Sequence, residues 1–504
     1  MEVFGNLFHN LMIGFGTAFS LQNLLFCFFG VFIGTFVGVL PGIGPIAAIA
    51  MLLPITYTLP AISALIMLAG IYYGTMYGSS TTSILVNLPG DAGSVITCLD
   101  GYQMARSGKA GPALAIAAIG SFFAGTVCTL LIAVVGPAMA NIALEFGAAE
   151  YFSLMAMGLV VSAVLTSGSP LKGIAMILLG LLLGSVGIDV NSGVSRLTFG
   201  FPALVEGISF VVLAMGIFGL SEILSNLEKG KDTATRDLLS KKIDHLYPTA
   251  NDLKQATGPI LRGTALGAFL GILPGAGATM SSFSSYAIEK KISKHPEQFG
   301  KGAIPGVAGP EAANNAAAQC AFIPTLTLGI PGSGTMALML GALIIQGITP
   351  GPTVVVRSPE LFWGLITSMW IGNFMLLALN LPLIGIWVRL LQIPYRYLFP
   401  AIITFMAIGV YSVNNSAVDV YLLVFFGILG YLFMKLDCEP APLILAFVLG
   451  PMMEENLRRA MVFSNGDLTV FFRKPISACF LAVTILLLIS LIWPLIKKSK
   501  KKAF

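Results

Sequence analysis

The sequence predicts an all-α polytopic membrane protein with about ten to twelve transmembrane helices. Of its 504 residues, 56% are hydrophobic and only 10% are charged, and the mean hydropathy is +0.89. Soluble domains carry about 25% charged residues, so this composition is typical of a chain that lies in lipid. Apolar stretches of membrane-spanning length recur from Leu21 to Trp493. These stretches are apolar all round, which excludes the alternating pattern of a β-barrel.

The distribution of basic residues predicts which segments face the cytoplasm. One long polar segment, residues 225–258, holds six lysines and arginines, and the chain ends in "KKSKKKAF". The positive-inside rule places both in the cytoplasm. We therefore expect a first membrane repeat at 1–224, a linker at 225–258, a second membrane repeat at 259–496 and a basic tail at 497–504. The start lacks the basic region of a signal peptide, so we expect it to be retained.

The sequence contains none of the common catalytic or cofactor motifs. The six cysteines are scattered without a C-x-x-C pair, and the three histidines lie outside any H-E-x-x-H context. A P-loop and a G-x-S-x-G are also missing. We therefore expect no enzyme, no cofactor and no nucleic-acid partner. An intramembrane hydrolase that uses Ser79, Ser282 or Asp91 is kept as an alternative.

Two glycine-rich motifs occur once in each half of the chain, in the same order. "GVLPGIGP" at 38–45 matches "GILPGAGA" at 271–278, and "NLPGDAGS" at 87–94 corresponds to "GIPGSGTM" at 329–336. Lysines follow the first motif only in the later half, and basic residues follow the second motif only in the early half. Because the basic bias changes sides between corresponding loops, we expect two inverted repeats, a common plan of secondary transporters.

The same motifs predict broken helices and a binding site. Proline removes a backbone donor and glycine weakens a helix, so each motif interrupts its helix and leaves amides and carbonyls that need partners. Helix N-termini at such breaks favour anions, and unwound carbonyls favour cations. The alternative is that glycine and serine only permit close helix packing. The expected substrate-binding residues are Pro41, Gly42, Gly44, Ser80, Thr81, Asn87, Gly90, Pro274, Gly275, Gly277, Thr279, Ser281, Asn314, Asn315, Pro331, Gly332 and Ser333.

Two acidic residues stand close to these motifs. Asp91 directly follows one predicted break, and Glu311 precedes an Asn-Asn pair. An acidic side chain at membrane depth is a functional candidate, because burying it without a role is unfavourable. We expect Asp91 and Glu311 to bind a coupling proton or sodium ion, with a position at the water interface as the alternative for each.

Two long segments resemble a known family. "GVLPGIGPIAAIAMLLPITYTLPAISALIMLAGIYYGTMYGSSTTSILVNLPGDAGSVITCLDGYQMARSGKAGPAL" and "GPEAANNAAAQCAFIPTLTLGIPGSGTMALMLGALIIQGITPGP" are similar to the large membrane subunit of tripartite tricarboxylate transporters, the TctA family. The resemblance implies a secondary transporter of the bacterial inner membrane, driven by sodium or protons. It also implies two partners, a small membrane subunit and a periplasmic substrate-binding protein.

The family's glycine-rich signatures fall on the predicted breaks and on Asn314 and Asn315. Gln319 and Cys320 depart from the family's glycine-rich pattern, and the position of Asp91 is variable in the family. The resemblance therefore leaves citrate and other di- or tricarboxylates open as substrates. A passive anion channel is the alternative to a carrier.

Overall fold

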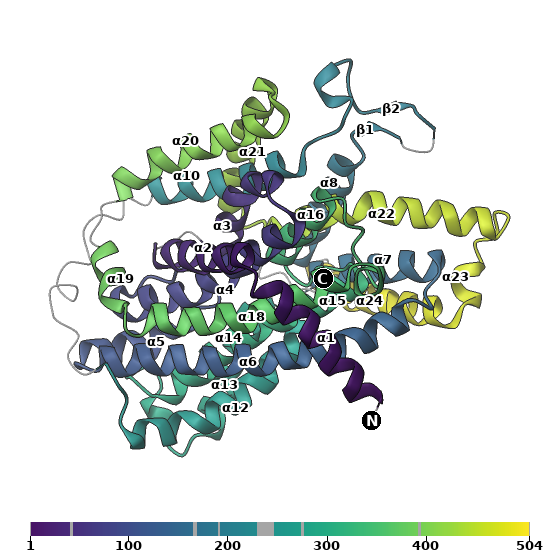
Figure 1. Cartoon of the computed structure of the whole chain (residues 1–504). Helices are drawn as coiled ribbons and strands as arrows, with labels where there is room; N and C mark the ends of the chain where they lie inside the picture. The colour runs from purple at the N-terminus through teal and green to yellow at the C-terminus, as the bar shows by residue number, and fades with distance from the viewer. Residues whose placement is uncertain are drawn as a thin grey trace.

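The computed structural model describes residues 2–40, 44–164, 169–189, 192–228, 246–273, 277–391 and 395–502. These residues form a helical assembly in which several long helices run side by side (Figure 1). Within the described residues, the sheet structure is one antiparallel pair, β1 (Gly187–Ile188) with β2 (Ser195–Arg196). The predicted all-α class is confirmed.

Each predicted break lies between the end of one helix and the start of the next. The chain up to the linker forms α1 (Glu2–Ala18), α2 (Leu21–Val39), α3 (Pro45–Leu52), η1 (Leu53–Thr58), α4 (Ala61–Val86), α5 (Val95–Arg106), α6 (Ala110–Ala143), α7 (Ala148–Val164), α8 (Pro170–Gly184), η2 (Pro202–Leu204), α9 (Phe210–Ala214), η3 (Met215–Leu220) and α10 (Ser221–Glu228). The first two breaks thus follow α2 and α4.

The later half has the same kind of interruptions after α12 and α15. It forms α12 (Ala250–Ile272), α13 (Gly277–Ile292), η4 (Pro296–Gln298), α14 (Pro305–Cys320), α15 (Phe322–Leu328), α16 (Gly334–Ile345), α17 (Thr353–Arg357), α18 (Pro359–Asn380), α19 (Ile384–Leu390), α20 (Tyr395–Asn414), α21 (Ala417–Lys435), α22 (Ala441–Phe463), α23 (Val470–Arg473) and α24 (Pro475–Lys502). Most of the predicted linker, residues 229–245, lies outside the described residues. The four broken helices are confirmed, whereas the domain boundaries and the duplication stay predictions.

Six helical stretches among the described residues are long and apolar enough to cross a membrane. They are Leu21–Val39, Ala61–Val86, Ala110–Ala143, Phe210–Glu228, Pro359–Asn380 and Ala417–Lys435. Six further apolar helices are shorter, among them Gly334–Ile345, which begins at a predicted break. The chain is therefore a multi-pass membrane protein, and the count of ten to twelve crossings stays a prediction.

Two helix pairs pack through glycine without intervening side chains. On α2, a Cβ added at Gly30, Gly34 or Gly38 would overlap a carbonyl oxygen of α4. On α12, Gly263, Gly267 and Gly271 lie in the same way against carbonyl oxygens of α14. Small residues let backbones approach closely in membrane helices. We call these two rows the glycine ladders; each leads into a glycine-rich break and positions it.

Candidate functional site

The four breaks converge on one cavity of about 790 Å³, which we call the central cavity. Its wall includes residues from every break: Gly44 and Pro45, then Pro89, Gly90, Asp91 and Ala92, then Gly277, Ala278, Thr279 and Met280, and finally Gly332, Ser333, Gly334 and Thr335. Segments almost 300 residues apart in sequence therefore share one space. The size falls within the roughly 300–1,000 Å³ of small-molecule sites.

Helix N-termini surround this cavity. The first residues of α3, α5, α13 and α16, namely Pro45, Val95, Gly277 and Gly334, all line it. The first amides of a helix have no partner within the helix, and the helix dipole makes this end partly positive. Four such ends around one space can bind the oxygens of an anion without a basic side chain.

The break after α4 ends in a capping carboxylate. Asn87 closes α4 in a left-handed conformation with φ of 55°. Asp91 then accepts hydrogen bonds from the amides of Ser94 at 3.0 Å and Gly93 at 3.3 Å. The Ser94 hydroxyl donates to the Asp91 carbonyl oxygen at 3.0 Å. The carboxylate is thus fixed at the start of α5, at the wall of the central cavity.

The break before α16 ends in a capping hydroxyl. Gly329 closes α15 with φ of 70°, a conformation that favours glycine. Ser333 Oγ accepts from the Met336 amide at 3.3 Å. A Cβ added at Gly332 would meet its nearest atom, the carbonyl oxygen of Gly271, only at 3.6 Å. Gly332 therefore leaves room at the cavity wall, and a larger side chain there would occupy the cavity.

The charged side chains of the central cavity are acidic. Asp91, Glu222 and Glu439 line it, and its wall includes no lysine, arginine or histidine among the residues that the structure describes. An anion in this space would therefore meet backbone amides and hydroxyls together with carboxylates. Its binding would be favoured by a cation bound at the same time.

Glu311 lies on α14 behind this cavity and is only 1% exposed. The Ser80 hydroxyl donates to Glu311 Oε2 at 2.7 Å, and the Thr97 hydroxyl donates to Oε1. The ion pairs found in the described part of the chain do not include Glu311. A buried carboxyl group with hydroxyl partners alone suits a site that takes up a proton or a small cation.

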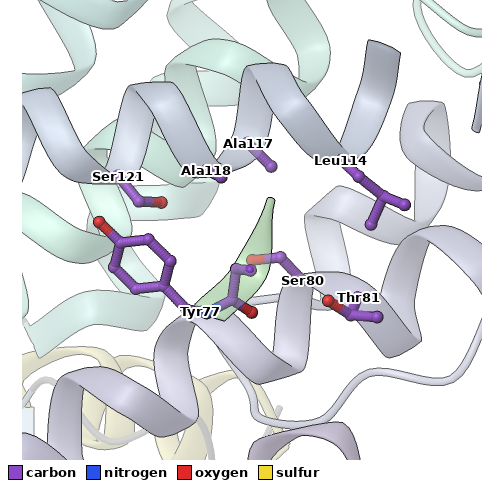
Figure 2. A pocket seen from close by; sticks show the side chains of 8 residues that line it. Tyr77, Ser80, Thr81, Leu114, Ala117, Ala118 and Ser121 are labelled. Carbon is purple, nitrogen blue, oxygen red and sulfur yellow. The ribbon is translucent and has the colours of Figure 1, made fainter. Parts of the chain in front are cut away.

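The structure divides the predicted binding residues into four groups. Those that line the central cavity are Gly44, Gly90, Gly277, Thr279, Gly332 and Ser333, together with Asp91. Ser80 and Thr81 line a second, much smaller cavity that also includes Ser121 (Figure 2). Pro41, Gly42, Pro274 and Gly275 lie outside the described residues.

The remaining predicted residues surround these spaces without lining either cavity. Asn87 is exposed, Pro331 is buried, and the Ser281 hydroxyl donates to the Gly277 carbonyl oxygen at 2.9 Å. Asn315 donates to Ser121 Oγ at 2.7 Å. Asn314 is fully buried against Gly93, and neither atom of its amide has a partner in the described structure. Asn314 is thus a second candidate ligand beside the Asp91 break.

Sequence reasoning missed Asp100 on α5. Its Oδ1 accepts from the amides of Gly300, Gly302 and Ala303 at 2.8 to 2.9 Å, and its Oδ2 accepts from the Tyr286 hydroxyl at 3.0 Å. This fully buried carboxylate holds the loop between α13 and α14. The available signal was an acid within the predicted first membrane repeat, where a buried charge is unusual.

Tyr72 and the acids Glu222 and Glu439 in the central cavity were also missed. Tyr72 lies on α4, Glu222 on α10 and Glu439 just before α22, and none of them belongs to a glycine-rich motif. No group of three or more histidine, cysteine, aspartate or glutamate side chains that could hold a metal ion occurs in the described ranges.

Comparisons with known proteins place the sequence among its relatives. The model of the tripartite tricarboxylate transporter TctA family matches residues 24–445. A protein of Agrobacterium vitis, described as an uncharacterized 52.8 kDa protein in the TAR-I ttuC' 3' region, is 56% identical over 99% of both chains. A second protein of that organism, described by its place in the TAR-II ttuC' 3' region, is 58% identical over 47% of this chain and 98% of its own length. No solved structure matches the chain.

Proposed function

Because the chain belongs to the tripartite tricarboxylate transporter TctA family, we propose that it imports tricarboxylates or related carboxylates by cation symport. In this proposal it is the large subunit of a binding-protein-dependent secondary transporter. The observation that carries the proposal is the central cavity, where four helix N-termini meet. Membership in a transporter family points away from an enzyme, and we propose no catalytic role for its serines.

The cavity wall favours a carboxylate over a cation or a neutral solute as the main substrate. Helix N-termini offer several amide donors to the carboxylate oxygens, and Thr279, Ser333 and Thr335 add hydroxyls. A volume of about 790 Å³ leaves space for a small multi-carboxylate together with water.

The acids of the cavity favour cotransport with a cation. Asp91 faces the same space as the helix N-termini, and Glu311 lies behind it in a buried site. A cation bound at either acid would offset the charge of the substrate and raise its affinity, and the substrate would raise the affinity of the cation equally. Asp91 and Glu311 therefore remain the candidates for binding sodium or a proton.

The packing of the helices supports two repeats in the proposed carrier, whose inversion we propose from the positions of the basic residues. The contact of α2 with α4 has a counterpart in that of α12 with α14, and α6 packs on α14 as α18 packs on α4. The helices α6 and α18 also contact each other. Broken helices in paired positions suit alternating access around one site better than a passive channel does.

The proposed partners are a small membrane subunit and a periplasmic binding protein that delivers the carboxylate. The proposed location is the inner membrane of a bacterium. These elements rest on the family, whose name describes a tripartite system. The basic linker 225–258 and the tail would then face the cytoplasm.

Uptake of labelled citrate and a panel of di- and tricarboxylates into proteoliposomes tests the proposal. The chain is reconstituted alone and with its small subunit and binding protein, under a sodium or a pH gradient. We expect accumulation only with the binding protein and only under one gradient. If no carboxylate is bound or taken up by the assembled complex, the proposal is wrong.

The variant Gly332→Val locates the site within the fold. A valine there would project into the central cavity, so we expect uptake to be lost while the protein remains folded. Gly385→Val is the matched control, because a Cβ at Gly385 meets no atom within 4 Å. Normal uptake by Gly332→Val would remove the central cavity from the proposal.

A further inference from the structure

The small cavity of Figure 2 lies between α4, α6 and α18 and has a volume of about 10 Å³. This is roughly the space of one water molecule. Its wall combines apolar residues with five polar side chains, those of Tyr77, Ser80, Thr81, Ser121 and Asn380. Polar cavities of this size hold buried water when two to four groups can bond to it.

The hydrogen bonds around the cavity leave groups that a water would satisfy. Asn380 is 4% exposed and donates to the Leu376 carbonyl oxygen at 2.9 Å, but its Oδ1 has no partner in the described structure. Ser121 Oγ accepts from Asn315, which leaves its own proton free to be donated. A water in the cavity can accept from Ser121 and donate to Asn380 Oδ1, which removes the cost of an unpaired buried acceptor.

Ser80 connects this cavity to Glu311. Ser80 lines the cavity, and its hydroxyl has two acceptors in reach, Glu311 Oε2 at 2.7 Å and the Met76 carbonyl oxygen at 3.2 Å. When Glu311 is ionised, Ser80 donates to the carboxylate. When Glu311 is protonated, it donates to Ser80 Oγ and Ser80 donates to Met76. Both protonation states of Glu311 are therefore hydrogen-bonded without a rearrangement of the helices.

We propose that one water in the small cavity loads a proton onto Glu311 through Ser80, so that the proton is the coupling cation. An excess proton from the aqueous phase reaches the water and passes to Ser80 Oγ, while the Ser80 hydroxyl proton passes to Glu311 Oε2. One O–H bond breaks and one forms at Ser80, and the water is left neutral. This inference rests on the proposed symport and names its ion.

Several ionisable groups surround Glu311, and their hydrogen-bond partners favour Glu311 as the group that gains the proton. On α4 and α5 these groups are Tyr77, Cys98 and Asp100, with Asp91 in the break between the two helices. On α13 and α12 they are Tyr286, Glu289 and Arg262, and Glu289 pairs with Arg262 at 2.7 Å. The neighbouring helix α6 offers Cys128 but no acidic or basic residue. Asp100 accepts from three amides and one hydroxyl, and Glu289 is paired with Arg262. Glu311 has two hydroxyl partners instead, and one of them, Ser80, has a second acceptor and can reverse its role.

Proton movement during carboxylate uptake tests this inference on the reconstituted complex with a pH dye inside the vesicles. We expect protons to enter with the substrate, and Glu311→Gln to abolish this flux while equilibrium binding of the carboxylate persists. Ser121→Ala and Asn380→Leu should slow proton-coupled uptake by at least about tenfold, since positioned proton transfer contributes strongly to rate. The control Thr129→Ala lies on the same helix as Ser121, is equally buried and should keep the wild-type rate.

An infrared measurement separates this role from a merely structural one. A protonated carboxyl group has its own carbonyl band, which should appear as pH falls and be lost in Glu311→Gln but not in Thr129→Ala. Uptake driven by sodium with no proton flux would overturn the inference and leave the proposed function intact. An unchanged band and flux in Glu311→Gln would also overturn it. Absence of carboxylate binding in the wild type would instead overturn the proposed function, and the inference with it.

Discussion

The break after α4 and the break after α15 have the same backbone plan but differ in charge. In each, a left-handed residue ends the helix, Asn87 or Gly329, and a side chain four residues later caps the next turn. Both caps accept from the amide three residues on, but one is the carboxylate of Asp91 and the other the hydroxyl of Ser333. The shared backbone plan thus carries a negative charge in one of the two breaks only.

The second candidate acid, Glu311, lies in the later half of the chain, whereas Asp91 lies in the early half. Met67 on α4 and Gly309 on α14 lie opposite the first glycine of each ladder. Counted from these residues, Glu311 on α14 corresponds to Ala69 on α4. Each half therefore supplies one acid where the other half is neutral. The comparison teaches that the backbone of the site is shared between the halves, whereas its chemistry is not.

Making the two breaks alike should have the largest effect. We expect Asp91→Ser to keep the cap but to reduce the cation dependence of carboxylate affinity by roughly 5- to 150-fold, the usual range of coupling between sites. The measurement is carboxylate binding at several sodium concentrations and pH values. Ser333→Ala is the control, since it removes a cap without a charge. Unaltered cation dependence in Asp91→Ser would exclude Asp91 as a coupling site.

The two break glycines should respond differently to the same small substitution. A Cβ at Gly90 would lie 2.6 Å from the Gly38 carbonyl oxygen, whereas a Cβ at Gly332 would meet its nearest atom at 3.6 Å, an ordinary van der Waals distance. We expect Gly90→Ala to destabilise the protein by about 1–3 kcal/mol through overpacking and Gly332→Ala to leave stability unchanged. Thermal unfolding of both variants in detergent checks this. Equal melting temperatures would show that the breaks are packed alike.

The loops before α4 and α14 are also held unequally. Gln346 Nε2 donates to the Thr56 carbonyl oxygen of the loop before α4 at 2.6 Å, whereas Asp100 accepts hydrogen bonds from three amides of the loop before α14. We expect Asp100→Ala to cost about 1–3 kcal/mol, because three amides, including the buried amide of Ala303, lose their acceptor, and Gln346→Ala to cost less. Amide hydrogen exchange at 300–303 and at 53–58 measures both. Faster exchange at 53–58 than at 300–303 in the respective variants would reverse the comparison.

The smallest expected effect concerns the starts of α2 and α12 and depends on pH. Hydrogen bonds from the Thr249 side chain and backbone lower the pKa of Asp252 at the start of α12, whereas α2 is capped by the uncharged Ser20. Because the pKa is lowered by folding, its stabilising contribution is present above the ordinary aspartate pKa of about 3.9 and is lost as pH falls through the folded pKa.

We therefore expect the first turn of α12, but not that of α2, to exchange its amides faster at pH 3 than at pH 6. Thr249→Ala should remove this difference and cost about 1 kcal/mol at pH 6. Ser20→Ala should cost a similar amount without changing the pH response of α2. The same acid response at both helix starts would mean that Asp252 is not its cause.

The sequence predicted the breaks well because their cause is local. Proline and glycine interrupt a helix wherever they stand, so the ends of α2, α4, α12 and α15 follow from short motifs. The convergence of the breaks was inferred from their pairing, and the central cavity brings them together.

The hydrogen-bond partners of Glu311 and Asp100 could not be predicted from the sequence, for a physical reason. Ser80 and Glu311 are 231 positions apart, and their contact depends on how α4 crosses α14. Asp100 reaches the loop before α14 over a similar separation. The crossing of two helices follows from the packing of the whole bundle, which no short motif encodes.

The glycine ladders have a mechanical consequence. Where side chains lie between two helices, they can change rotamer and absorb a displacement. Between α2 and α4 the backbone of Gly30, Gly34 and Gly38 contacts the partner helix directly, so no side chain at these contacts can absorb a displacement by changing rotamer. Each of the two helix pairs should therefore move as one rigid unit, and the break at the end of its glycine ladder forms part of the wall of the central cavity. A displacement at the N-terminal end of α2 would therefore move the α2–α4 pair as a whole, including its part of the cavity wall. Relative sliding would occur at the contacts between the two helix pairs and not within them.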